Sequence, residues 1–287
     1  MKKFVINITV NETFAALQQQ LAIAQAALEE ANNASTSSAA NTAKTKATNA
    51  LSAAQTLAAQ LDSSYTSAAN EILEEMQTCV SGCTTRYNKL VDDEFVATMN
   101  AINVGTAYTA SSMYGPAMSN LQYTQLYENG AWVSNIYYGA SYTTKNIRYK
   151  VCYNPPNSRT IWLIQDQMAE PYGHSGTPGL SGTLSALISK GFPTMTVTIT
   201  IAGKTYTVTG TMPTKAEAQT AGVANMKFST TDVNFVTYWT KTPHENYSSN
   251  KLYYTIRWNS SANKAEFGTS DTVNNAVALA FLIKINY

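Results

Sequence analysis

The first hundred residues contain almost nothing that would interrupt an α-helix. No proline occurs between Asn11 and Asn103, and the first glycine of the chain is Gly82. Ala, Leu, Gln, Glu, Ser, Thr and Asn dominate the remaining positions, so long helix is the main option left to this segment. A single continuous helix of that length would extend roughly 140 Å at about 1.5 Å per residue, far beyond the width of a small domain.

Apolar residues recur along this segment at steps of three and four, which places them on one side of a helix. They are Phe14, Leu17, Leu21, Ala24, Leu28 and Ala31, followed by Leu51, Ala54, Ala58, Leu61, Tyr65, Ala68 and Ile72. A lone helix cannot shield so narrow a stripe from water, so the pattern predicts partner helices, as in a coiled coil. We therefore predict an oligomer interface at Phe14, Leu17, Leu21, Leu28, Leu51, Leu61, Tyr65 and Ile72.

The stripe is interrupted between residues 32 and 49, where every large apolar residue is lost and the heptad phase shifts by two positions. Two interpretations stay open. The helix continues with a local change of supercoil, or it folds back as a hairpin near Asn32 and Asn33. The lack of glycine and proline favours the continuous helix, which should end between Asn100 and Gly105.

The rest of the chain has the opposite composition, because all eight prolines and every glycine after Gly82 lie there. Short apolar or alternating segments predict strands at 121–127, 131–138, 147–153, 160–165, 195–201, 205–210, 225–229, 233–240, 252–258 and 277–286. Asn129 and Gly130 form a strong hairpin signal, and single helical turns are predicted near 184–190 and 214–220. Helix followed by strands predicts an α+β protein.

The predicted architecture is a long N-terminal helix or coiled coil, preceded by a short strand and followed by a C-terminal antiparallel β-sandwich-like domain. Its parts are an anchoring strand at 1–10, a helical stalk at 11–104, a linker at 105–120 and the β domain at 121–287. The first strand rests on the alternation of Phe4, Ile6, Ile8 and Val10. It has no neighbouring strand in sequence, so we expect it to pair with a sheet in another subunit or another protein.

Composition and charge argue against several classes of partner. Charged residues make up 13% of the chain and the net charge is +1, without the basic clusters that nucleic-acid binding requires. The longest apolar run, at 276–283, is too short to span a membrane, and polar residues interrupt the apolar start before it resembles an export signal. We expect neither nucleic acid nor membrane as a partner.

Residues with catalytic or metal-binding chemistry are sparse. Cys79, Cys83 and Cys152 make no disulfide framework or metal pattern, and neither His174 nor His244 has the context of a triad or metal site. The best carboxylate pair for a glycosidase is Asp166 with Glu170, beside the glycine-rich stretch at 171–183, and only its position recommends it. The sequence predicts no enzyme, no metal and no cofactor.

Aromatic residues near the predicted hairpins and loops are the stronger candidates for a binding role. Tyr and Trp at such positions stack on sugars or anchor protein contacts, although cross-strand packing is their commoner role. The candidate receptor contacts are Trp132, Tyr137, Tyr138, Tyr142 and Trp239.

A short anchoring strand, an Ala/Ser/Thr/Asn-rich helical stalk and a Tyr/Thr/Asn-rich β domain together resemble bacteriophage virion fibre or spike proteins, of the tail-fibre or head-fibre type. The low charge is similar to that of virion proteins from phages of gut Bacteroidetes, including the crAss-like group. The resemblance implies a homotrimer in the virion, assembled in the host cytoplasm, with its N-terminus bound to other virion proteins. It also implies a distal β domain that binds host surface glycan or protein.

Two other functions remain open at this point. The chain could be an interior, collar or portal-associated structural protein of the virion, whose helices pack against other proteins. A polysaccharide depolymerase is the third class, and it would depend on a carboxylate pair such as Asp166 and Glu170.

Overall fold

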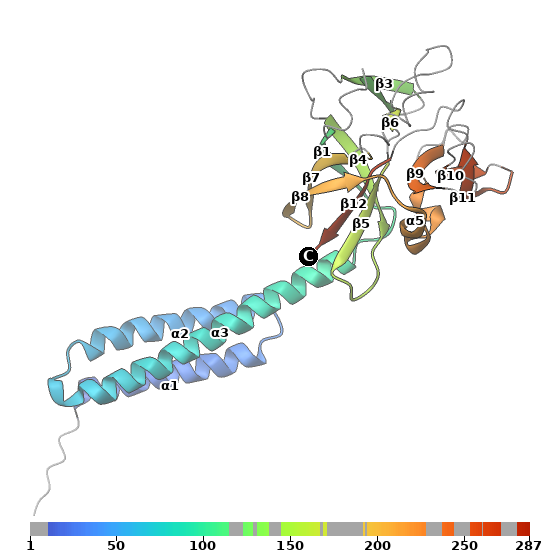
Figure 1. Cartoon of the computed structure of the whole chain (residues 1–287). Helices are drawn as coiled ribbons and strands as arrows, with labels where there is room; N and C mark the ends of the chain where they lie inside the picture. Colours follow the sequence, from blue (N-terminus) through green and yellow to red (C-terminus); the bar gives the residue numbers. More distant parts are fainter. Residues whose placement is uncertain are drawn as a thin grey trace, which may run out of the picture. The chain divides into compact units, whose positions relative to one another are not determined.

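The computed structural model divides the chain into two compact units, Met1–Ala97 and Thr98–Tyr287, which we call the helical unit and the β unit (Figure 1). The residues that the structure describes are 11–114, 123–128, 131–137, 145–166, 169–170, 192, 194–227, 237–243, 253–259, 261–270 and 280–287. The mixed helix and strand content and the order of the two parts confirm the coarse α+β prediction. The strand predicted at 2–10 lies outside the described residues.

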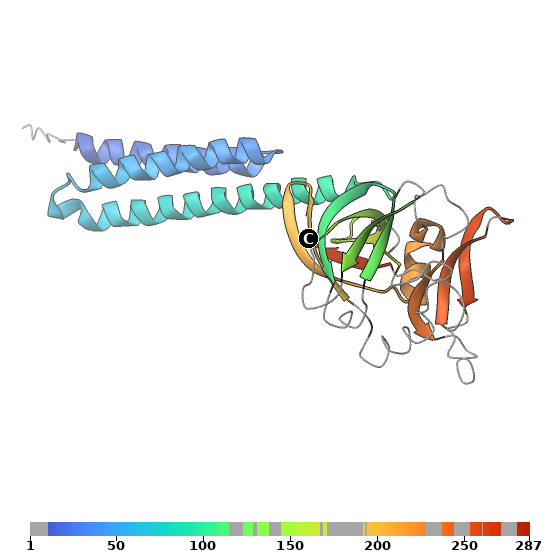
Figure 2. The same cartoon turned by 90° about the horizontal axis from the view of Figure 1, so that it is seen from above.

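The helical unit contains three helices instead of one continuous helix. They are α1 (Glu12–Asn33), α2 (Ser37–Ala58) and α3 (Thr66–Asn100). The three lie side by side in both views, with the chain reversing direction between α1 and α2 and again between α2 and α3 (Figures 1 and 2). The continuous helix favoured by the sequence is therefore wrong. The alternative, a reversal near Asn32 and Asn33, is confirmed, and the second reversal was not predicted.

Both reversals form without glycine or proline because capping side chains satisfy the free backbone N–H groups of the new helices. The Thr36 side chain accepts a hydrogen bond from the Ala39 N–H at the start of α2. Asp62 does the same for Ser64 in the 3-10 helix η1 (Ser63–Tyr65) before α3. Arg86 of α3 donates to the carbonyl of Ala34 in the first turn at 2.6 Å, which ties that turn to the third helix.

Small side chains let α1 and α2 approach closely. Their contact is made largely by buried alanines: Ala24, Ala27, Ala31, Ala40, Ala43, Ala47, Ala50 and Ala54. Residues 32–49, which lack large apolar side chains, thus comprise the first turn and the part of α2 that packs against α1 through alanines. The third helix contributes larger buried side chains to the same core, among them Met76, Cys79 and Cys83.

The apolar stripe is covered within the chain. Leu17 is fully buried, and Phe14, Leu21, Leu28, Leu51, Leu61 and Ile72 pack against the same intramolecular core. The Tyr65 ring lies 5.0 Å from that of Phe14, centroid to centroid. The other helices of the same chain supply the shielding for which the sequence predicted further subunits, so an oligomer no longer follows from the stripe.

The β unit is built on a closed antiparallel barrel with strand order β1-β4-β5-β12-β8-β7. The strands are β1 (Ala107–Tyr114), β4 (Lys145–Tyr153), β5 (Thr160–Gln165), β7 (Thr194–Ile201), β8 (Lys204–Thr211) and β12 (Leu282–Asn286). The predicted sandwich is corrected to a barrel. The predicted linker at 105–120 is also wrong in part, because β1 begins at Ala107 and pairs with both β4 and β7.

Two three-stranded sheets accompany the barrel. One has the order β3-β2-β6, from β2 (Tyr123–Glu128), β3 (Ala131–Tyr137) and β6 (Ala169–Glu170); the other has the order β11-β10-β9, from β9 (Thr237–Pro243), β10 (Tyr253–Asn259) and β11 (Lys264–Ser270). Pairing of β2 with β3 confirms the predicted hairpin around residues 129–130. The strand predicted at 225–229 is wrong at its described residues, 225–227, because a 3-10 helix, η3 (Val223–Met226), follows helix α5 (Lys215–Ala221).

Alternation along the barrel strands divides their side chains between two cores. On β4, Ile147, Tyr149 and Val151 face the barrel interior, while Cys152 faces outward. The outer core joins Cys152, Ile164 and Leu282 of the barrel to Ala218, Ala221, Met226, Tyr238 and Ile256 of the covering elements. The charged outward side chains of β4 therefore lie where the barrel wall meets η3 and β9.

Candidate functional site

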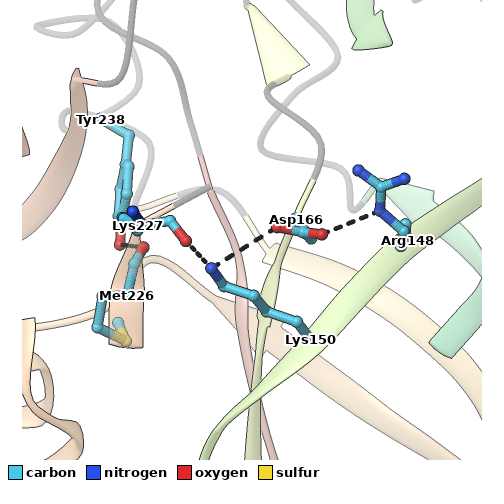
Figure 3. Close-up of polar contacts among 6 residues, drawn as sticks. All are labelled: Arg148, Lys150, Asp166, Met226, Lys227 and Tyr238. Carbon is cyan, nitrogen blue, oxygen red and sulfur yellow. Dashed lines mark hydrogen bonds and ion pairs between the residues drawn. The ribbon is translucent and has the colours of Figure 1, made fainter. Parts of the chain in front are cut away.

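Asp166, one of the two carboxylates singled out from the sequence, lies at the end of β5 in an ion-pair cluster (Figure 3). Its side chain is only 2% exposed. Arg148 Nε donates to Asp166 Oδ2 at 2.9 Å, and Lys150 Nζ lies 3.8 Å from Oδ1. The Asp166 N–H also donates to the Arg148 carbonyl at 2.8 Å. Both oxygens of the carboxylate thus face cations.

Lys150 enters this cluster from β4, two residues after Arg148 and on the same outward side of the strand. Its ammonium group also donates a hydrogen bond to the carbonyl of Lys227, directly after η3. Burial lowers the pKa of Lys150; the negative charge of Asp166 opposes that shift, and the nearby charge of Lys227 adds to it. The cluster holds a desolvated cation that depends on Asp166 for charge compensation.

Tyr238 of β9 extends the same polar layer (Figure 3). Its hydroxyl donates to the carbonyl of Met226, the last residue of η3, at 2.6 Å. Burial raises the pKa of this fully enclosed phenol well above its usual value. Together these contacts join β4 and β5 of the barrel to η3 and β9. We call this set of contacts a clamp, because it holds the covering elements against the barrel.

The second carboxylate of the predicted pair, Glu170, has its backbone in β6, but its side chain lies outside the described part of the structure. The described residues therefore do not bring a carboxylate pair together around Asp166. The Asp166 side chain contacts the cations Arg148 and Lys150.

The aromatic candidates stay predictions. Trp132 and Tyr137 have their backbones in β3, and Trp239 has its backbone in β9. The side chains of these three residues, and the whole of Tyr138 and Tyr142, lie outside what the structure describes.

A second surface is formed by the hairpin of β7 and β8, whose strands the sequence predicted without assigning them a binding role. Every outward position of the hairpin is threonine, in four directly opposed pairs: Thr194 with Thr211, Thr196 with Thr209, Thr198 with Thr207, and Thr200 with Thr205. Two pairs join their hydroxyl groups, at 3.1 Å for Thr198 with Thr207 and 2.9 Å for Thr200 with Thr205. The strict alternation of threonine with apolar residues in 194–211 was the available signal.

Strand β1 continues this surface on the other side of β7. Ser111 lies opposite Thr198 and Met113 opposite Thr196, and both are exposed. We call the outward side of β1, β7 and β8 the hydroxyl face. Its paired positions offer hydroxyl groups and the thioether side chain of Met113, and none of them carries a formal charge.

Metal-binding clusters and membrane-spanning helices are absent from the described residues. Within the described ranges, no three His, Cys, Asp or Glu side chains are grouped so that they could hold a metal ion. Cys79, Cys83 and Cys152 are free thiols and all are buried. None of the described helices combines the length and apolar character needed to cross a bilayer.

Comparison with known proteins supplies no relative. No protein-family model matches the sequence, and neither the curated proteins nor the solved structures contain a significant match.

Proposed function

We propose that this chain is a structural protein of a bacteriophage virion whose β unit contacts a neutral glycan or protein surface through the hydroxyl face. The observation that carries the proposal is the run of four directly opposed threonine pairs on β7 and β8. The low charge of the whole chain and the resemblance of its composition to virion fibre proteins support it.

The chemistry of the hydroxyl face suits neutral, hydroxyl-rich partners. Threonine is β-branched, so its χ1 angle is restricted and its hydroxyl group is held in place on a strand. Each hydroxyl both donates and accepts hydrogen bonds. Binding such a surface desolvates no formal charge, which avoids the large penalty that buried ions incur.

Many copies on one particle would make weak contacts effective. A single hydroxyl face offers few large anchoring side chains, so we expect low affinity for each copy. Several copies held on one virion raise the effective concentration of the second and later contacts. The proposed protein is a homotrimer located in the virion. Its copies contact one another through surfaces other than the apolar stripe.

The binding test places charge in the middle of the hydroxyl face. The double variant Thr198→Lys/Thr207→Lys should weaken binding of the chain to bacterial cells or their surface polysaccharide at least about tenfold, because two ammonium groups must then be desolvated. The matched control is Thr78→Lys/Thr85→Lys on the exposed side of α3. Equal binding by both double variants would refute the role of the hydroxyl face.

The location is tested separately on particles. Gold-labelled antibody against the β unit should decorate intact virions if the chain is displayed outside. Label that reaches the antigen only after particles are opened would favour the interior or collar role, in which the helices contact other virion proteins.

A further inference from the structure

Gln165 is a polar side chain enclosed in the barrel of the β unit. It is the last residue of β5, and its N–H donates to the carbonyl of Phe281 at 2.9 Å. Its side chain is 0% exposed, and neither Nε2 nor Oε1 has a hydrogen-bond partner among the described residues. A primary amide has two N–H donors and one carbonyl acceptor, so both the donors and the acceptor of this side chain lack hydrogen-bond partners within the described part of the chain.

One polar side chain of the barrel interior, that of Tyr149, is the cross-strand neighbour of Gln165. Gln165 lies directly opposite Tyr149 of β4, which also faces the interior and is fully buried. The Tyr149 hydroxyl lies 3.3 Å from Ser112 Oγ and 3.0 Å from Met195 Sδ. Tyr149 therefore has partners of its own at this level of the barrel.

Formal charges lie on the other side of the barrel wall. Because successive side chains of a strand point to opposite faces, Arg148 and Lys150 leave the wall on the side away from Tyr149. Asp166, which follows Gln165, joins those two cations in the outer cluster. A molecule bound at the Gln165 amide would meet neutral donors and acceptors, so its own chemistry should be neutral.

The size of the barrel limits such a molecule. Eight strands are about the number at which a barrel interior is filled by side chains or just holds one small ligand, and this barrel has six. The interior is occupied by large side chains such as Ile161, Leu163 and Phe281. Only a molecule about the size of water fits these limits, and buried waters in proteins typically serve polar groups that lack partners.

We propose that Gln165 forms an internal hydration site, at which buried water accepts a hydrogen bond from Nε2 and donates one to Oε1. This water satisfies an amide that would otherwise destabilise the barrel.

The direct test is nuclear magnetic resonance on the full-length protein, with water itself as the probe. We expect cross-relaxation between water and the Gln165 side-chain NH₂ protons, with the sign that marks a water held longer than solvent. The Tyr149→Phe and Ser112→Ala variants remove hydroxyl protons that could relay exchange, and the signal should survive both. Absence of a water signal at this NH₂ group, or its loss in these variants, would overturn the proposal.

A stability comparison gives an independent readout. Gln165→Met has nearly the same shape but no amide. If water satisfies the wild-type amide, the variant should not be more stable than the wild type by more than about fivefold in the folding equilibrium constant, whereas an amide without partners would make it so. Leu163→Met, also inside the barrel on β5, is the control for inserting methionine there. A Gln165→Met protein whose folding equilibrium constant exceeds that of the wild type by more than about fivefold would also overturn the proposal. If that variant does not fold, the water signal of the wild-type protein decides alone.

Discussion

Leu28 of α1 packs onto Gly82 of α3 so closely that a Cβ atom added to Gly82 would lie 2.6 Å from Leu28 Cδ1. Gly82 is the first glycine of the chain and stands inside a 35-residue helix, where glycine costs about 1 kcal/mol relative to alanine. The contact explains its place, because the missing side chain leaves room for a leucine from the neighbouring helix. Gly82 is thus a packing residue of the helical unit.

Filling this contact should destabilise the helical unit. In Gly82→Leu, the new side chain competes with Leu28, and overpacking of this kind typically costs about 1–3 kcal/mol. Helix unfolding followed by far-UV circular dichroism in urea measures the change. The control is Ser81→Leu, which adds the same side chain at an exposed position one residue away. Equal stability of the two variants would show that the Leu28 contact does not restrict position 82.

The core of the helical unit should belong to one chain. Met76 is fully buried between the helices, and Met76→Ala should lower the free energy of unfolding by about 2–5 kcal/mol. Because the stripe is covered within the chain, the midpoint of helix unfolding should not move when the protein is diluted tenfold, in the wild type or the variant. Gln77→Ala, at an exposed position, serves as the control. A midpoint that falls on dilution would instead indicate that contacts between chains stabilise the helices.

The buried ion cluster should matter more than exposed ion pairs. Asp166→Asn removes the charge that compensates Lys150, and breaking one side of a buried pair typically costs about 3 kcal/mol or more. All four tryptophans lie in the β unit, so tryptophan fluorescence during urea unfolding reports that unit alone.

The matched control for this cluster is Asp93→Asn. It breaks a pair with Lys89 on α3 whose side chains are 50% and 61% exposed, and such pairs contribute little. The helical unit holds no tryptophan, so helix unfolding followed by far-UV circular dichroism in urea measures this control. A small effect at Asp166, similar to that at Asp93, would contradict the role of the cluster as a clamp.

Cys152 should make the β unit lose stability in alkali. Burial raises the pKa of this thiol from 9.0 to about 12. Between these values the unfolded chain gives up the proton while the folded protein keeps it, so unfolding is favoured as pH rises above 9. The loss approaches about 1.4 kcal/mol for each pH unit.

The measurement is the slope of stability against pH, by tryptophan fluorescence from pH 8 to 10. Burial also raises the pKa of Tyr149 and Tyr238, which adds to the loss near and above pH 10, whereas the lowered pKa of Lys150 acts in the opposite direction. Cys152→Ala keeps all three groups, so its slope between pH 9 and 10 should be shallower. Identical slopes would show that the thiol titrates alike in both states.

Local signals in the sequence predicted a good part of the β unit. The hairpin of β7 and β8 followed from the alternation of threonine with apolar residues, and its turn uses positive φ at Ala202 and Gly203. Strand β1 was missed because Ala110, Ser111 and Ser112 have no strong strand preference. Its pairing with β4 and β7, both distant in sequence, holds it in the barrel.

The candidate site was predictable only in part. Asp166 was recognised as a carboxylate of interest, but Arg148 and Lys150 meet it only through the pairing of β4 with β5. Threonine alternation was visible in the sequence, yet its extension onto β1 required the order of strands in the barrel. Gln165 gave no sequence signal, since burial of a glutamine depends on everything that packs around it.

The sequence alone determined that residues 11–100 are mainly helical, that strands follow, and where several tight turns form. These properties depend on hydrogen bonds and side-chain alternation within a few neighbouring residues. The tertiary structure decided what covers the apolar stripe and that six strands close into a barrel. Hydrophobic burial is not directional, so the same stripe is shielded equally well by a sister chain or by the next helix of its own chain. Because the chain turns at 34–36 and 59–65, the helices of this protein shield the stripe within one chain.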